Sequence, residues 1–254
     1  MRFLITNDDG IHAPGIEVLA RVASHFGEVR VVAPDTERSG VSHAITLYKP
    51  LRLRDIRPGW TMCDGTPTDC VYLALHQLDL KPDFVLSGIN PGPNLGHDVL
   101  YSGTVAGALE GAHWGVPSLA ISHCSSQEDE IAQFEGQLTA LLPRLLDVAK
   151  TVGGALNVNL PPWSKGPWRG VVGTRMGQRF YSNEVISRND PRGRHYYWIG
   201  GANVRMPDIE GSDCNAIRDG FVSITALGDD LTRPSALATI TAHLDKHQIE
   251  IPII

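Results

Sequence analysis

The sequence predicts an α/β protein built on a mostly parallel sheet with helices on both faces, and a β-rich extension in its C-terminal part. Two observations indicate this fold class. Short apolar runs alternate with helical patterns in the first half of the chain, and polar loops rich in glycine and proline separate them. The 254 residues can bury one large core and no Gly/Ser linker divides them, so we expect one domain over residues 1–254.

The expected elements follow one another along the chain. Predicted strands are the apolar runs Arg2–Thr6, Val29–Ala33, Phe84–Ser87, Ser118–Ser122 and Leu156–Asn159. Predicted helices are Ile16–Phe26, Thr68–Leu78, Thr104–Trp114 and Gln133–Val148. A hairpin is expected from Ile45–Arg54 and Thr61–Cys63. Gly65-Thr66-Pro67-Thr68-Asp69 predicts the start of a helix, with Thr66 as N-cap; a substrate-facing role for this segment is the alternative.

The pattern changes between about residues 168 and 226. Short β-rich segments such as Val171–Thr174, His195–Ile199 and Phe221–Thr225 are separated there by turn-forming residues, for example at 189–193. We expect this segment to be an extension carried on the α/β core, with a role in oligomerisation. His243 and His247, four residues apart, are expected on the surface of a helix.

Composition limits the function and the compartment. A net charge of -6 argues against binding to a nucleic acid duplex. It does not exclude a small phosphate ester, because a metal ion and a helix N-terminus can supply local positive potential. Four cysteines without a C-x-x-C pair favour reduced thiols, and the first apolar run is too short for a signal peptide or a membrane span. We therefore expect a cytoplasmic protein.

The strongest local signal is Asn7-Asp8-Asp9-Gly10, directly after the first predicted strand. Adjacent carboxylates repel each other unless a cation or hydrogen-bond donors compensate. Gly10 permits a sharp turn that aims both carboxylates at one point. The alternative is that the aspartates only cap the following helix.

Two further polar loops follow predicted strands. Ser39-Gly40 can present a hydroxyl and a backbone N–H together, although such a step is also common in simple turns. Residues 87–98 form a long loop stiffened by glycine and proline, from which Asn90 and Asn94 project. This loop matches neither G-x-G-x-x-G nor the P-loop pattern. A loop of this length and stiffness favours a binding site over a purely structural role.

The long loop leads into a helix start at which Ser102 is the expected N-cap, followed by Gly103 and Thr104. Unpaired N–H groups there could receive a phosphate, and an ordinary cap on a closely packed helix is equally compatible with the pattern.

All of these loops should open at the carboxyl edge of a parallel sheet, where such sheets bind ligands. Two carboxylates, a serine and an asparagine form an all-oxygen set that suits Mg²⁺, Mn²⁺ or Ca²⁺ and disfavours structural zinc. His12, His43 and His97 lie in or near these loops and could contact substrate or simply be solvated.

Together these motifs resemble the survival protein SurE family of 5′/3′-nucleotidases. The residues that carry the resemblance are Asn7-Asp8-Asp9-Gly10, Val32-Ala33-Pro34-Asp35, Arg38-Ser39-Gly40, Gly65-Thr66-Pro67-Thr68-Asp69-Cys70, Ser87-Gly88-Ile89-Asn90, Gly92-Pro93-Asn94-Leu95-Gly96, Tyr101-Ser102-Gly103-Thr104-Val105, Asp190-Pro191-Arg192-Gly193, Tyr197-Trp198 and Gly220-Phe221-Val222-Ser223-Ile224-Thr225. They cover nearly the whole chain. Ala44 departs from the family, many of whose members have a serine at this position, so no hydroxyl role is expected there.

The resemblance implies a Rossmann-like core and a metal-dependent phosphatase acting on nucleoside 5′-monophosphates, with 3′-monophosphates and short polyphosphate as further candidates. It assigns Asp8, Asp9, Ser39 and Asn90 to one divalent metal ion, Mg²⁺ or Mn²⁺. Contacts to the phosphate are expected from a second set: Gly40, Asn94, Ser102, Gly103 and Thr104. It also implies homodimers or homotetramers.

For the reaction we expect direct attack of a metal-associated water on phosphorus. Asn94 and Ser102 would stabilise charge on the phosphoryl oxygens, and Asp8 or Asp9 would orient the water or act as base. Two rival hypotheses remain: a phosphatase that forms an aspartyl-phosphate, and a nucleotide-binding protein without catalysis. The spacing of Asp8 and Asp9 argues against the first, since that chemistry usually places a second aspartate two positions after the nucleophile.

Overall fold

The computed structural model describes residues 1–125, 128–182, 184–200 and 204–247. Nine of the described strands form one sheet in the order β3-β4-β2-β1-β5-β6-β7-β13-β8. Its six central strands, from β4 to β7, run parallel to one another. Beyond them, β3 is antiparallel to β4, and β13 is antiparallel to β7. The expected α/β class with a mostly parallel sheet is therefore confirmed.

The strands of the first half lie close to their predicted positions. Their bounds are β1 Arg2–Thr6, β2 Glu28–Pro34, β3 Leu53–Arg57, β4 Trp60–Cys63, β5 Phe84–Pro91, β6 Ser118–His123 and β7 Ala155–Leu160. The expected hairpin forms from β3 and β4, but its first strand starts only at Leu53. The preceding segment instead bonds to the start of a helix: the Thr66 hydroxyl donates to Ala44 O, and the backbone N–H of Thr46 donates to Asp69.

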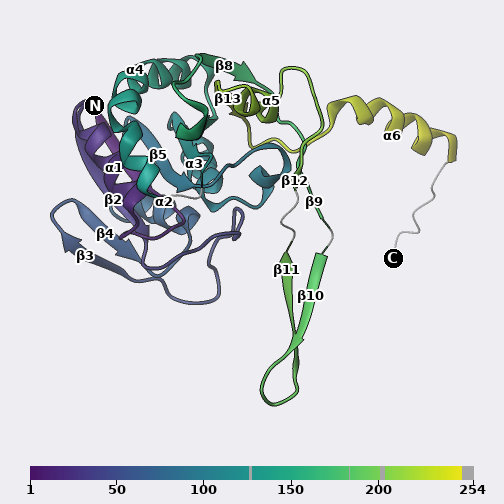
Figure 1. Ribbon diagram of the computed structural model, residues 1–254, viewed down its shortest axis with the longest axis horizontal. Coiled ribbons are helices and arrows are strands. Elements are labelled where there is room, and N and C mark those ends of the chain that lie inside the picture. The colour runs from purple at the N-terminus through teal and green to yellow at the C-terminus, as the bar shows by residue number, and fades with distance from the viewer. Residues whose placement is uncertain (126–127, 183, 201–203, 248–254) are drawn as a thin grey trace.

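Helices cover both faces of the sheet (Figure 1). Their bounds are α1 Pro14–Ser24, α2 Pro67–His76, α3 Gly103–His113 and α4 Glu135–Val152. α1 packs against α4 on one face, and α2 packs against α3 on the other. Thr66 and Asp69 form the expected capping box at the start of α2. No helix in the described part of the chain combines the length and the apolar character that a membrane crossing requires.

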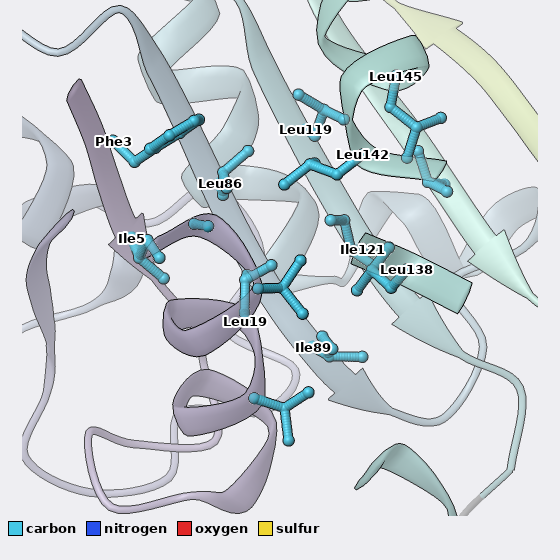
Figure 2. Packing of buried hydrophobic residues seen from close by; sticks show 14 of the residues in the cluster. Phe3, Ile5, Leu19, Leu86, Ile89, Leu119, Ile121, Leu138, Leu142 and Leu145 are labelled. Carbon is cyan, nitrogen blue, oxygen red and sulfur yellow. The ribbon is translucent and has the colours of Figure 1, made fainter. Parts of the chain in front are cut away.

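The main apolar core lies between the sheet and the α1–α4 layer. Side chains from the central strands, such as Ile5, Leu86 and Leu119, interdigitate there with Leu19 of α1 and Leu142 of α4 (Figure 2). Burial of these large apolar side chains provides most of the favourable free energy of folding. It fixes β1 and β5 side by side in the middle of the sheet.

The β-rich segment has two different parts. β8 Val171–Thr174 and β13 Val222–Leu227 belong to the main sheet, so the expected extension from about 168 to 226 is too wide. Outside that sheet lie two short antiparallel pairs, formed by β9 Phe180–Tyr181, β10 Glu184–Asn189, β11 His195–Gly200 and β12 Val204–Arg205. The β10–β11 pair, here called the arm, projects away from the body (Figure 1). Val222 and Ser223 are almost completely buried, so β13 is part of the core of the protein.

Two further helices lie in the C-terminal part of the described chain, and only α5 has no counterpart in the sequence analysis. α5 Asp213–Arg218 packs against β13. α6 Pro234–His247 extends from the body (Figure 1), and Leu237, Ile240 and Leu244 on it are exposed. His243 lies on this helix and is exposed, as expected; His247 ends it.

Candidate active site

The candidate site lies where the strand order of the parallel sheet reverses. From β1 the chain builds β2 and β4 on one side, then returns to build β5, β6 and β7 on the other. Ligands of open α/β sheets bind at such a point, outside the carboxyl ends of the strands. A cavity of about 1240 Å³ opens here, lined by residues between 8 and 14, 35 and 40, 90 and 102, and 181 and 200.

The predicted metal and phosphate residues converge on this cavity. Seven of them line it: Asp8, Asp9, Ser39, Gly40, Asn90, Asn94 and Ser102. They come from segments that are far apart in sequence, at the carboxyl ends of β1, β2 and β5 and in the residues that follow these strands. The other two predicted phosphate contacts, Gly103 and Thr104, lie next to the lining at the start of α3. They lie behind Asp8 and hold it in place.

Asp8 is the most constrained of these side chains, with only 3% of its surface exposed. Burial raises the pKa of its carboxyl group, while hydrogen bonds from the Thr104 hydroxyl and from nearby backbone N–H groups partly oppose that rise. A Cβ on Gly103 would lie 2.9 Å from Asp8 Oδ2, so only glycine lets the start of α3 approach this closely. The positive end of the α3 dipole therefore faces a buried acid.

The turn after Asp8 presents the second carboxylate. Asn7 donates from Nδ2 to the carbonyl oxygen of Gly10 over 2.9 Å, and Gly10 adopts φ +99°. This closes the sharp turn expected from the sequence. Asp9 is half-buried, whereas Asp8 is buried, so Asp9 is the more accessible carboxylate of the pair.

The loop that carries Ser39 is tied directly to this turn. The backbone N–H of Arg38 donates to the carbonyl oxygen of Asp8 over 2.6 Å. The Ser39 hydroxyl donates to Glu37 Oε1 over 3.0 Å, which leaves lone pairs on its oxygen for another partner. Asp35 and Glu37 also line the cavity, and the sequence analysis did not single them out.

Asn90 is aimed by an irregularity in β5. The pairing between β5 and β6 shifts register between Gly88 and Asn90, and such shifts re-aim side chains at strand ends. A Cβ on Gly88, which has φ +131°, would lie 2.2 Å from the carbonyl oxygen of Ile121, so this backbone path requires glycine. Asn90 donates from Nδ2 to Gly92 O over 2.8 Å, and its carboxamide oxygen is the atom that could bind a cation.

Asn94 is held by polar side chains that the sequence analysis missed. Its backbone N–H donates to Asn159 Oδ1 over 2.9 Å, and its carbonyl oxygen accepts from both Asn157 and Asn159. Its own amide donates to Ser122 Oγ over 2.8 Å. The signal available in the sequence was a pair of asparagines at alternate positions in an otherwise apolar strand. They fasten the long loop to the buried sheet.

The loop histidines have different surroundings. His12 is exposed and lines the cavity. His43 lies 2.9 Å from Glu110 Oε2 on α3, and the His97 ring packs against Phe180. Ser102 caps α3 by accepting a hydrogen bond from Val105 N over 3.0 Å, and it also lines the cavity.

The cavity is strongly acidic. Five carboxylates line it, from Asp8, Asp9, Asp35, Glu37 and Asp98, and the lining that the structure describes contains no Lys or Arg. A phosphate could not approach them without a compensating cation. The described residues also bring together no group of three His, Cys, Asp or Glu that could hold a metal. The predicted ligands are all oxygen atoms, from carboxylates and neutral groups, which suits a hard cation and argues against zinc.

The fold and this cavity together define an α/β protein that could bind a phosphate ester through a hard divalent cation at the switch point of its sheet. The family model described as survival protein SurE matches residues 3–183. The chain belongs to this family.

Relatives and a solved structure agree with this assignment. The chain is 50% identical to a protein named 5′-nucleotidase SurE from Anaeromyxobacter sp. (strain Fw109-5), with 93% of each chain covered. It is 45% identical to the protein of the same name from Geobacter metallireducens, covering 94% of this chain and 96% of the relative. The crystal structure of the SurE protein from Aquifex aeolicus matches with a TM-score of 0.79 at 37% identity, covering 96% of this chain and 99% of that one.

Proposed function

We propose that this chain is a metal-dependent phosphomonoesterase that releases phosphate from nucleoside 5′-monophosphates. The observation that carries the proposal is the convergence of Asp8 and Asp9 with Ser39 and Asn90 on one acidic cavity. This arrangement requires a cation before it can accept a phosphate. The name 5′-nucleotidase SurE, carried by relatives of about half-identical sequence, supports the same substrate class.

Asp8, Asp9, Ser39 and Asn90 would hold one divalent ion, Mg²⁺ or Mn²⁺. When bound, such an ion neutralises the phosphoryl oxygens and lowers the pKa of an associated water. The donor chemistry fits, because buried Asp8 is a carboxylate whose ionised form is disfavoured by burial and would be stabilised by a nearby positive charge. Thr104 and Gly103 would hold the Asp8 carboxylate, and the same helix start would contact the phosphate.

The two aspartates would have different roles. Asp8 is buried and its carboxylate accepts a hydrogen bond from the Thr104 hydroxyl, so it would serve as a fixed ligand of the metal ion. Asp9, at the cavity surface, would accept the proton of the attacking water as the new P–O bond forms and the bond to the nucleoside oxygen breaks. Asn94 and Ser102, both on the lining, would donate hydrogen bonds to the phosphoryl oxygens, and Gly40 would offer its backbone N–H.

Phosphate release from AMP and GMP, measured with Mg²⁺, with Mn²⁺ and with chelator, tests the proposal. We expect release only with metal. No release with either ion would leave a non-catalytic nucleotide-binding protein, and trapping a phosphoryl-enzyme would support the aspartyl-phosphate mechanism instead. Adding 3′-monophosphates and short polyphosphate to the panel defines the breadth of the activity.

We also propose that the chain forms homodimers or homotetramers through its C-terminal part and works in the cytoplasm. The arm exposes Tyr197 and Trp198 by 64% each, and α6 exposes Leu237 by 66%. Exposed apolar groups of this size are typical of interfaces. The four cysteines, all in the described chain, are free, as in a reducing compartment. Light scattering at several protein concentrations measures the oligomeric state.

A further inference from the structure

The cavity extends well beyond the residues assigned to metal and phosphate. Its volume of about 1240 Å³ exceeds the roughly 300–1,000 Å³ typical of small-molecule pockets. The lining near β1 and α3 is polar and acidic. The opposite part, contributed by residues between 181 and 200, presents Tyr181, Val185 and Ile199. A ligand held by its phosphate at the polar end would therefore meet an aromatic ring and two aliphatic side chains with its remaining part.

Tyr181 is fixed in position by a polar network. Its hydroxyl donates to Asp98 Oδ2 over 2.6 Å, and the Arg179 guanidinium pairs with the same carboxylate. The Arg179 guanidinium also lies 5.4 Å from the centre of the Tyr181 ring. Even so, Tyr181 remains 47% exposed. A ring that is fastened at its hydroxyl but still accessible loses little conformational entropy when a flat ligand stacks on it.

Val185 and Ile199 form the neighbouring apolar surface. They oppose each other in the β10–β11 ladder, so their side chains lie on the same face of the arm. Val185 is 61% exposed and Ile199 is 94% exposed, although both line the cavity. Solvent-exposed aliphatic groups beside an accessible aromatic ring favour an apolar, planar ligand group.

We infer that this end of the cavity is a nucleobase subsite, in which the Tyr181 ring is the stacking platform and Val185 and Ile199 contact the edge of the base. The inference rests on the proposed function and defines how the substrate is recognised. The described lining contains no Lys or Arg, and the charge of the nearby Arg179 is already paired with Asp98. A neutral base fits such a surface, whereas the anionic chain of a polyphosphate does not.

The test compares AMP with ribose 5-phosphate, which keeps the sugar and the phosphate but lacks the base. The quantity measured is the ratio of kcat/KM for AMP to kcat/KM for ribose 5-phosphate. We expect Tyr181→Ala to lower this ratio about tenfold, within the range found when an aromatic side chain that stacks on a base is replaced by alanine. Tyr181→Phe keeps the ring and loses only the hydroxyl, so it should recover most of the ratio.

Trp198→Ala is the matched control. Trp198 is an exposed aromatic residue of the arm that carries Ile199, and because it adjoins Ile199 in the strand it projects from the opposite face. Its variant should keep the wild-type ratio. An unchanged ratio in Tyr181→Ala, or an equal fall in Trp198→Ala, would overturn the subsite while phosphate release from AMP still upholds the phosphatase. Absence of metal-dependent release from both substrates would instead reject the proposed function itself.

Discussion

The two sides of the cavity are built in different ways. On the sheet side, Asp8, Asn94 and Ser102 are buried and fastened by hydrogen bonds to strands and to the start of α3. On the arm side, Val185 and Ile199 are largely exposed. Groups that perform chemistry need a fixed geometry, which burial and supporting hydrogen bonds provide. Exposed side chains outside the main sheet are free to serve recognition or assembly. The contrast agrees with our proposals that catalysis takes place on the sheet side and that the arm side contacts the base.

The largest effect is expected from Asp8→Asn. Replacing even a residue that only supports a metal ligand typically costs 10–100-fold, so loss of a ligand should lower kcat/KM for AMP by more than about 100-fold. Melting of the metal-free protein should be nearly unchanged or slightly raised, because the variant removes a buried acid. Activity assays with Mn²⁺ and calorimetry without metal measure the two effects. Retention of most activity would contradict the metal assignment.

Gly103→Ala tests whether the start of α3 positions Asp8. The added Cβ would lie 2.8 Å from Asp8 Cβ, so the carboxylate must shift. Displacements of about 1 Å can cost up to about 100-fold in rate, and we expect a loss between about tenfold and a hundredfold. Gly136→Ala at the start of α4 is the matched control, since a Cβ there meets nothing within 4 Å. That variant should keep full activity; equal losses in both would contradict the positioning role.

Asn159→Ala tests the network under the long loop. It removes the acceptor of the Asn94 backbone N–H and one donor to the Asn94 carbonyl oxygen. A buried group left without its hydrogen bond typically costs about 1–3 kcal/mol, which chemical denaturation can measure. We also expect a fall in kcat, because Asn94 loses its support. Wild-type kcat in a destabilised variant would show that the network serves the fold alone.

Much of the sheet side could be predicted from the sequence, because its signals are local. Apolar runs identify β1 and β5, and the residues that follow them identify Asp8, Asp9 and Asn90. The supporting contacts could not be predicted in this way. Asn94 and Asn159 are 65 residues apart, and Asp98 and Tyr181 are 83 apart. Only the packed sheet brings such pairs together, and periodicity in the sequence carries no information about them.

The same reason explains the errors in the C-terminal half. β8 and β13 have short β patterns like those of the arm, and their place in the main sheet depends on pairing with each other and with β7. The Asp8–Thr104 contact adds a supporting role for Gly103 and Thr104 that the sequence did not indicate. The partners of this helix start lie about one hundred residues away in sequence, so periodicity does not reveal them.

The smallest effects on stability should come from two histidines whose pKa values are shifted in opposite directions. Burial lowers the pKa of His123, which lies at the end of β6 with its ring against Phe134. The unfolded chain, whose histidines titrate near 6.5, then binds the proton more readily. Stability from this group is therefore complete above about pH 6.5 and falls on acidification, by at most about 1.4 kcal/mol per pH unit. His123→Leu should flatten this part of the unfolding profile.

His113 should behave in the reverse direction. Its hydrogen bond to Asp229, 3.0 Å long, raises the pKa of this exposed imidazole at the end of α3. The folded state then binds the proton more readily than the unfolded chain does. The stability that His113 contributes is therefore present below about pH 6.5 and is lost as the pH rises through the raised pKa. Solvent screening keeps it small. His113→Gln should therefore reduce stability only on the acid side, where His123→Leu increases it relative to wild type. Chemical denaturation of both variants between pH 5 and pH 8 measures these changes in the free energy of unfolding. If both variants changed it in the same direction at acid pH, the contrast between the buried and the exposed histidine would be contradicted.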